Sequence, residues 1–218
     1  RYGRNAATNL IDGIGYSTYH SLQTQLNRRF SNGFQFQTSY TWSKNIGLCC
    51  DEENNGGPRI KAISFLHLNR AVLNLDRTHN FQATAIYELP FGTGRRWNPQ
   101  NGFANALVSG WQINTLVSIM SGSPFSITAD GSSLRMPGND QRADQVKGEV
   151  QKLGGVGIGN AYYDFTAFAR VTEARFGTAG WNSLRGPGAF NSDLGLFRRF
   201  AMSERANLEF RAEAFNWT

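Results

Sequence analysis

Charge and long apolar runs are both scarce in this sequence. Only 17% of its 218 residues are Asp, Glu, Lys or Arg, against about 25% in an average soluble protein. No segment approaches the roughly 18 consecutive apolar residues that a membrane-spanning helix needs, which excludes a helical membrane protein. A membrane β-barrel is not excluded, because each of its strands alternates apolar residues with polar ones.

Cysteine and histidine are rare and form no metal-binding pattern. The two cysteines, Cys49 and Cys50, are adjacent, so a disulfide between them would be strained, and their redox state and role stay open. The three histidines are scattered without the spacing of a zinc site. The acidic residues 51–53 carry oxygens that suit calcium, but a solvated loop tip is the favoured interpretation. We therefore predict no metal and no cofactor.

Motifs for catalysis and for nucleic-acid binding are missing as well. The sequence contains no nucleophile elbow, no paired-carboxylate site and no HExxH motif, so we expect that the protein is not an enzyme. The formal net charge is +6, but the basic residues are scattered and no basic helix or aromatic RNA-binding motif accompanies them. We expect no nucleic-acid partner, and an anionic membrane surface fits the charge at least as well.

Alternation of polar and apolar residues is the feature that the sequence does contain. In residues 34–44 every large ring occupies an even position, which is typical of a strand with one apolar and one polar face. The same alternation predicts strands near residues 16–30, 34–44, 80–91, 107–121, 190–201 and 205–217. The predicted polar faces supply the candidate lumen-facing residues Gln35, Gln37, Gln112, Asn114, Glu209, Arg211 and Glu213.

The connections between these strands alternate in length. Short links follow the first, third and fifth strands, whereas the second and fourth are followed by the long loops 45–79 and 122–189. This is the pattern of outer-membrane barrels, whose long loops lie outside the cell. We therefore predict an all-β fold over residues 1–218, an antiparallel up-and-down sheet that forms a partial transmembrane β-barrel with long extracellular loops.

Two local features test this pattern. The link after the first strand contains Asn32 and Gly33, and parity favours a three-residue loop that pairs Phe30 with Phe34 and places Gly33 in a bulged turn. Arg28 and Arg198 fall on the predicted apolar faces. Both lie close to a short turn, where a long side chain can extend to lipid headgroups.

Several segments, taken in order, resemble the C-terminal barrel of TonB-dependent outer-membrane receptors, in the branch with an N-terminal carboxypeptidase-regulatory-like domain. The resemblance covers nearly the whole chain. The segments that carry it are residues 15–23 (GYSTYHSLQ), 39–44 (SYTWSK), 76–81 (DRTHNF), 110–113 (GWQI), 121–125 (SGSPF), 184–188 (LRGPG) and 211–216 (RAEAFN).

This resemblance implies a bacterial outer-membrane location and a plugged barrel of about 22 strands. It also implies lipid and lipopolysaccharide around the barrel, a plug domain, and uptake of an unidentified solute that is energised through TonB. The chain starts without Met and stops inside an alternating run, so we expect it to be a fragment of such a receptor.

The alternative from another class is a soluble secreted β-sandwich, such as an adhesin or a glycan-binding module. Its strands alternate too, but its apolar faces pack against each other.

Overall fold

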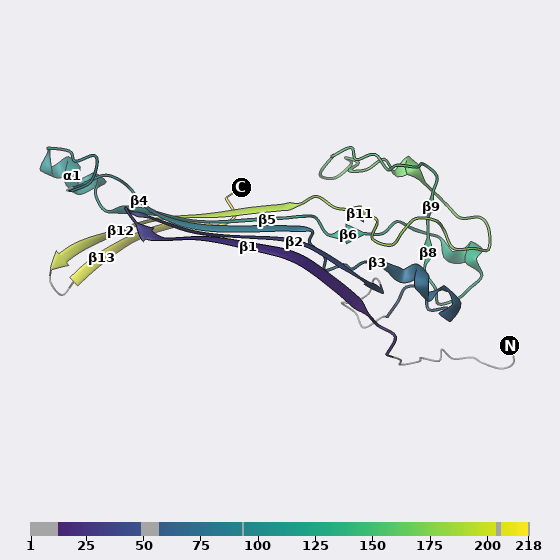
Figure 1. The fold of residues 1–218 in the computed structure, drawn as a ribbon. Coiled ribbons are helices and arrows are strands. Elements are labelled where there is room, and N and C mark those ends of the chain that lie inside the picture. Colours follow the sequence, from purple (N-terminus) through teal and green to yellow (C-terminus); the bar gives the residue numbers. More distant parts are fainter. Residues whose placement is uncertain (1–12, 49–56, 93, 204–205, 218) are drawn as a thin grey trace.

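One antiparallel sheet dominates the computed structural model, which describes residues 13–48, 57–92, 94–203 and 206–217. Its long strands follow one another in chain order (Figure 1). They are β1 (Ser17–Ser31), β2 (Phe34–Leu48), β4 (His79–Glu88), β5 (Trp111–Met120), β12 (Ala189–Ser203) and β13 (Ala206–Ala214). The short strand β3 (Arg70–Val72) pairs with the end of β2. The predicted all-β antiparallel fold is therefore confirmed.

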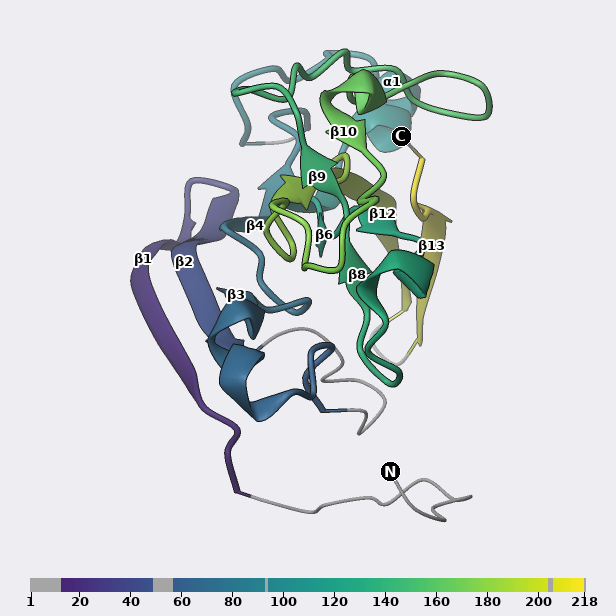
Figure 2. The same cartoon turned by 90° about the vertical axis from the view of Figure 1, so that its right-hand side faces the viewer.

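The sheet is curved but open. Figure 2, which looks along the strands, shows an arc that runs from β1 through β4 to β13. Within the described residues β1 pairs only with β2, and β13 only with β12. These strands therefore do not close a barrel by themselves.

The strand register places large apolar side chains on one face of the sheet across its four central strands. Tyr40 lies opposite Phe81, Phe81 opposite Ile119, and Ile119 opposite Phe190, so one row of four strands carries large apolar side chains on the same face. Ile119 and Phe190 are 43% and 52% exposed. An apolar face that none of the described residues covers is expected of a sheet whose neighbour is lipid.

The turn between β1 and β2 differs from the prediction. Asn32 and Gly33 both have positive φ angles, 52° and 75°, and Ser31 pairs with Phe34, so the connection is a two-residue hairpin turn. The register then shifts between Arg28 and Ser31. This irregularity in β1 restores the match between apolar faces that the prediction had assigned to a longer turn.

The strand predicted at residues 107–121 begins later than expected. Residues Gly102–Val108 form the helix α1, which Asn101 caps by accepting from the backbone N–H groups of Phe103 and Ala104. The strand β5 starts only at Trp111, after Gly110 with its φ of 75°. Leu107, predicted to lie in the strand, therefore lies in the helix.

The two long connections, residues 57–78 and 121–188, fold together into what we call the loop layer. The first contains the 3-10 helix η1 (Ile63–Asn69) and β3. The second contains β6 (Pro124–Phe125), β7 (Thr128–Ala129), η2 (Gly131–Leu134), β8 (Gln141–Arg142), β9 (Asp144–Gln145), η3 (Phe165–Ala167), β10 (Phe168–Ala169) and β11 (Leu184–Arg185). No helix among the described residues is long and apolar enough to cross a membrane.

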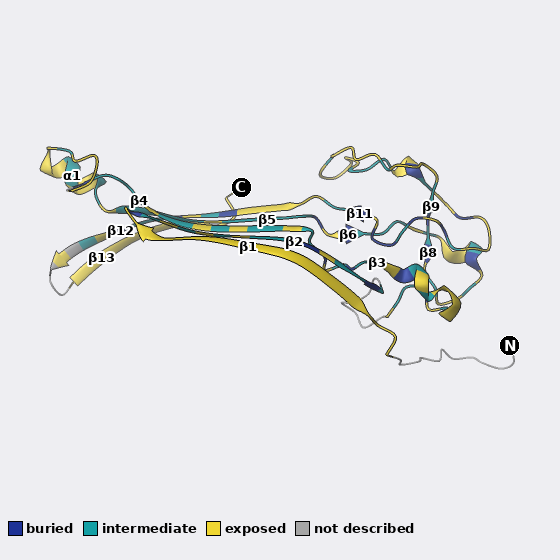
Figure 3. Cartoon of the chain, viewed as in Figure 1, coloured by how far each residue is buried: buried dark blue, intermediate teal, exposed yellow. Residues whose placement is uncertain are grey.

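Burial is concentrated in the loop layer (Figure 3). Ile60, Leu73 and Trp181, from both connections, form a core cluster with exposures of 0%, 7% and 3%. Every residue of β1 is exposed by contrast. The long connections are thus folded structure with their own core.

One excursion of the loop layer, residues 151–164, protrudes from this core. Its base is fixed by the backbone hydrogen bonds from Asp164 to Gln151 and from Leu153 to Tyr162, each 2.9 Å long. At its tip Ile158 is fully exposed, and a Cβ on either Gly157 or Gly159 would meet nothing within 4 Å. The tip therefore makes no packing contribution to the layer.

Candidate functional site: a polar sheet face beneath a folded loop layer

The seven predicted lumen-facing residues all lie on one face of the sheet, opposite the apolar face. Asn114 lies opposite Ile86 on one side and Gly195 on the other, and these pair in turn with Gln35 and Glu213. The next polar row joins Gln112 to Glu88 on one side and, through Phe197, to Arg211 on the other. Gln37 and Glu209 continue this face on β2 and β13. The register therefore brings the candidates together.

Three charged residues of this face, Arg199, Glu209 and Arg211, contact one another. Glu209 accepts from Arg199 and from Arg211, each at 3.0 Å, and the Arg211 guanidinium also lies 5.0 Å from the centroid of the Phe197 ring. On β5 the side-chain N–H of Gln112 donates to the side-chain oxygen of Asn114 at 2.6 Å. A polar, internally paired surface of this kind is what a water-filled lumen requires.

Arg198, which the sequence places on the apolar face, binds helix α1. It is only 6% exposed, donates to the backbone carbonyls of Ala106 and Leu107, and stacks on the rings of Trp111 and Phe200. A cation at the C-terminal end of a helix satisfies carbonyls that have no partner within the helix. The guanidinium carbon of Arg28 lies 5.3 Å from the centroid of the Phe34 ring. Both exceptions to the apolar pattern thus have local partners.

Three of the segments that carry the family resemblance meet at one point of the loop layer, which we call the motif junction. Asp76, whose side chain is fully buried, forms an ion pair with Arg185. Arg185 also donates to the carbonyl oxygen of Gly122 at 3.3 Å, and the N–H of Gly186 donates to Ser123 at 3.0 Å. A Cβ on Gly122 would collide with the Gly186 backbone, so the contact needs glycine. The motif junction joins the two long connections to each other, close to the ends of the long strands that they link.

Amide side chains add further links between the two connections. Asn182 donates to the carbonyl of Val72 at 2.8 Å and to the side chain of Asn74 at 2.7 Å. The Asn139 side-chain oxygen accepts from the backbone N–H groups of Lys61 and Ala62. These contacts join residues 77 to 110 positions apart in the chain. Sequence reasoning missed them, because contacts at such separations leave no periodic signal.

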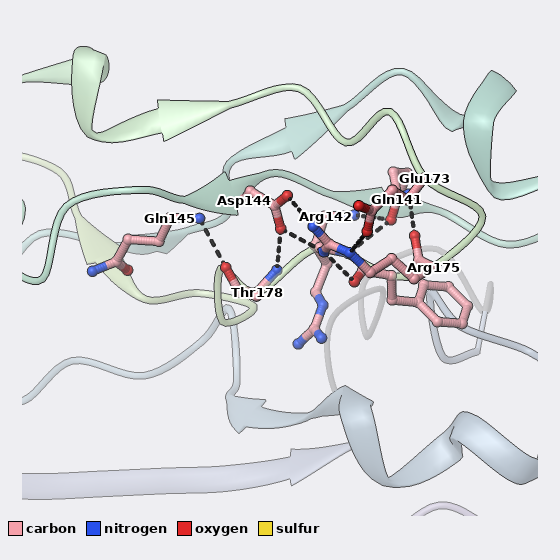
Figure 4. A network of polar contacts seen from close by, with 9 residues as sticks. Gln141, Arg142, Asp144, Gln145, Glu173, Arg175 and Thr178 are labelled. Atoms are coloured by element: carbon pink, nitrogen blue, oxygen red, sulfur yellow. Dashed lines mark hydrogen bonds and ion pairs between the residues drawn. The ribbon is translucent and has the colours of Figure 1, made fainter.

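A network of ion pairs holds the outer part of the loop layer (Figure 4). Arg175 forms a two-bonded pair with Asp144, at 2.8 and 2.7 Å, and its Nε donates to Glu173 at 2.6 Å. Hydrogen bonding from Arg175 holds the pKa of the Asp144 carboxyl below its ordinary value, assisted by the backbone N–H of Thr178. The same pairing with Asp144 and Glu173 raises the pKa of Arg175.

A second pair closes the base of the protruding excursion. Lys147 donates to Asp164 at 2.7 Å and also to the hydroxyl of Thr166 at 2.7 Å. The hydrogen bond from Lys147, followed by that from Thr166, lowers the pKa of Asp164 from its ordinary 3.8 to about 2. The carboxylate is therefore ionised throughout the neutral range.

A large cavity lies between the strand ends and the loop layer. Its volume is about 1010 Å³, and its lining includes Ser21 and Ser43 from the sheet with Arg142, Trp181 and Asn182 from the loops. The described residues contain no cluster of His, Cys, Asp or Glu that could hold a metal ion. Cys49, Cys50 and the acidic residues 51–53 lie outside the described residues.

The comparison with protein families decides between the two classes that the sequence left open. A family model described as an outer membrane beta barrel domain matches residues 2–218. The chain belongs to this outer membrane beta barrel domain family. No curated protein and no solved structure matches the chain significantly.

Membership of the outer membrane beta barrel domain family places the protein in the bacterial outer membrane. It also explains why the apolar face of the sheet is left exposed, because that face meets lipid in a barrel. The alternative of a soluble β-sandwich is set aside on the same grounds. In a sandwich a second sheet covers the apolar face, whereas the other three sheets among the described residues have only two short strands each.

Proposed function

We propose that this chain forms part of the barrel of a TonB-dependent outer-membrane receptor that takes up a solute. The observation that carries the proposal is the arrangement of the sheet, an uninterrupted antiparallel meander whose long connections fold into one layer at one end. A polar face and a folded loop layer on the same structure suit a protein that captures a solute outside the cell and passes it through a lumen.

The open edges of the sheet support a larger barrel. Unpaired backbone N–H and C=O groups in hydrocarbon cost several kcal/mol each, so membrane sheets close into barrels. The edges at β1 and β13 therefore require further strands. In the proposed receptor these strands complete the barrel, a plug domain fills it, and TonB supplies energy from the inner membrane.

The segments that resemble TonB-dependent receptors have a physical role that fits the proposal. Residues 76–81, 121–125 and 184–188 build the motif junction, which fixes the loop layer to the strand ends. The proposed role is recognition and transport without catalysis or a cofactor, with outer-membrane lipid and lipopolysaccharide as the surroundings and no nucleic acid as a partner.

An uptake experiment tests the proposal against a passive channel. Cells that carry the intact gene are given a mixture of small solutes, and depletion of each solute is followed by mass spectrometry in four strains, with and without the receptor and with and without TonB. We expect at least one solute to be depleted only where both proteins are present. Depletion that needs the barrel but persists without TonB would contradict energised uptake.

A further inference from the structure

The cavity beneath the loop layer contains an arginine without a counter-ion. The guanidinium of Arg142 points away from the ion-pair network (Figure 4), and Arg142 lines the cavity of about 1010 Å³. Its Nε is buried and has no hydrogen-bond partner, and no ion pair to it is found within the described part of the chain. Arg142 as a whole is half-buried, and even partial burial of a cation without a partner is costly.

The nearby acidic residues are already paired with other cations. Asp144, two positions away, is held by both terminal nitrogens of Arg175. Asp140 pairs with Arg59 at 3.0 Å, and Asp76 pairs with Arg185. Arg142 is thus left without a carboxylate although acids flank it in the sequence on both sides.

The lining of the cavity is electrically one-sided. Its charged members, Lys44, Arg70, Arg142 and Arg185, are all basic, and the lining contains no Asp or Glu among the described residues. The indole N–H of Trp181, which also lines the cavity, is a buried donor without a partner. Donors that are unpaired and a surface of one sign together indicate a site for an oxyanion.

We propose that this cavity binds the oxyanion group of a small soluble solute, with the Arg142 guanidinium as its charged partner. A guanidinium recognises a carboxylate, sulfate or phosphate through two parallel hydrogen bonds. The volume suits a small molecule, and burial, which lowers the pKa of Arg142, strengthens its attraction for an anion. This inference rests on the proposed function, because it names the chemical class of the solute that the receptor takes up.

Equilibrium dialysis of the purified full-length protein in detergent tests the site, with radiolabelled citrate and inorganic sulfate as probes at low ionic strength. Wild-type protein is expected to bind at least one probe saturably. Arg142→Gln should bind it at least about tenfold more weakly, since hydrogen bonds to charged groups are stronger than those between neutral groups. The matched control is Arg170→Gln in the same loop, whose side chain is 81% exposed and which should bind as wild type does.

A second variant keeps the test decisive where Arg142→Gln does not fold. Ser183→Phe narrows the cavity from an exposed position that leaves Arg142 intact, and it should also weaken binding. Absence of saturable binding of both probes by the wild-type protein would overturn the site, as would equal binding by Arg142→Gln and Arg170→Gln.

The outcomes separate this site from the proposed function. TonB-dependent depletion of a solute that Arg142→Gln leaves unchanged would contradict the anion site and leave the receptor function standing. Citrate or sulfate binding that depends on Arg142, without TonB-dependent uptake of any solute, would establish the site and contradict energised transport.

Discussion

Replacing Asp76 with Asn is expected to destabilise the loop layer by about 3 kcal/mol. The carboxylate is fully buried and accepts from Arg185, from the backbone N–H of Asn45 at 2.6 Å and from the hydroxyl of Thr78 at 3.3 Å. An amide keeps one acceptor oxygen for Asn45 but turns an NH₂ donor toward Arg185. Breaking a buried ion pair costs roughly 3–5 kcal/mol, and the 29% exposure of Arg185 places this case at the lower end.

Hydrogen exchange of the backbone amides in residues 121–188 measures the effect. Local opening that becomes about 3 kcal/mol easier speeds exchange of these amides by roughly a hundredfold, because each 1.4 kcal/mol is a factor of ten. Amides in the middle of β4 and β5 should keep their rates, since the junction lies beyond the ends of these strands. Glu173→Gln is the control, because that carboxylate is 70% exposed and its pair should contribute little.

A double-mutant cycle with Arg185→Met separates the ion pair from the loss of either side chain. The double variant Asp76→Asn/Arg185→Met should cost less than the sum of the two single changes, by 0.5–3 kcal/mol as an order-of-magnitude estimate. Costs that add up exactly, or exchange rates in Asp76→Asn within a factor of two of wild type, would refute the reasoning that the junction holds the layer.

Three further changes test other parts of the structure. Val117→Arg, on the apolar face, should destabilise the folded barrel in lipid by roughly 2–4 kcal/mol, whereas Asn114→Arg on the polar face should have a mild effect. Equal losses of stability in urea titrations would contradict the assignment of one face to lipid and the other to the lumen. Gly122→Ala should cost about 1–3 kcal/mol through overpacking at the motif junction, while Gly186→Ala, whose Cβ meets its first neighbour only at 3.8 Å, should be tolerated, and similar proteolysis rates for both would contradict this. The lowered pKa of Asp164, about 2 against an ordinary 3.8, means that its stabilising contribution is complete above about pH 4 and is lost as the pH falls toward 2. A carboxyl resonance that titrates near its ordinary pKa in NMR spectra would disprove that pairing.

The sheet could be predicted from the sequence because alternation is a local property. Every second residue of a two-faced strand has the same polar or apolar character, so each strand can be recognised from its own residues alone. The predictions were wrong where the chain departs from this alternation. Parity favoured a three-residue turn at Gly33, whereas a two-residue turn with an irregularity in β1 restores the same match. Leu107 was assigned to a strand, although Asn101 caps a helix that contains it.

The loop layer could not be predicted in the same way. Its core joins Ile60, Leu73 and Trp181, and the ion pair of Asp76 with Arg185 spans 109 positions of the chain. Each family segment is recognisable by its own residues, but nothing in the spacing of the segments indicates that three of them meet. The missing counter-ion of Arg142 could not be predicted from the sequence either. It results from the pairing of the neighbouring acidic residues with other cations.

The protruding excursion offers a practical use for this architecture. A Cβ added to Gly157 or Gly159 at its tip would meet no atom within 4 Å, while hydrogen bonds at its base hold the two sides of the chain together. A foreign peptide inserted at the tip would be held by the hydrogen-bonded base of the excursion and would not disturb the core formed by Ile60, Leu73 and Trp181. The long connections of outer-membrane barrels lie outside the cell, so such an epitope should be displayed on the surface of living cells, where an antibody could report the protein's abundance and orientation.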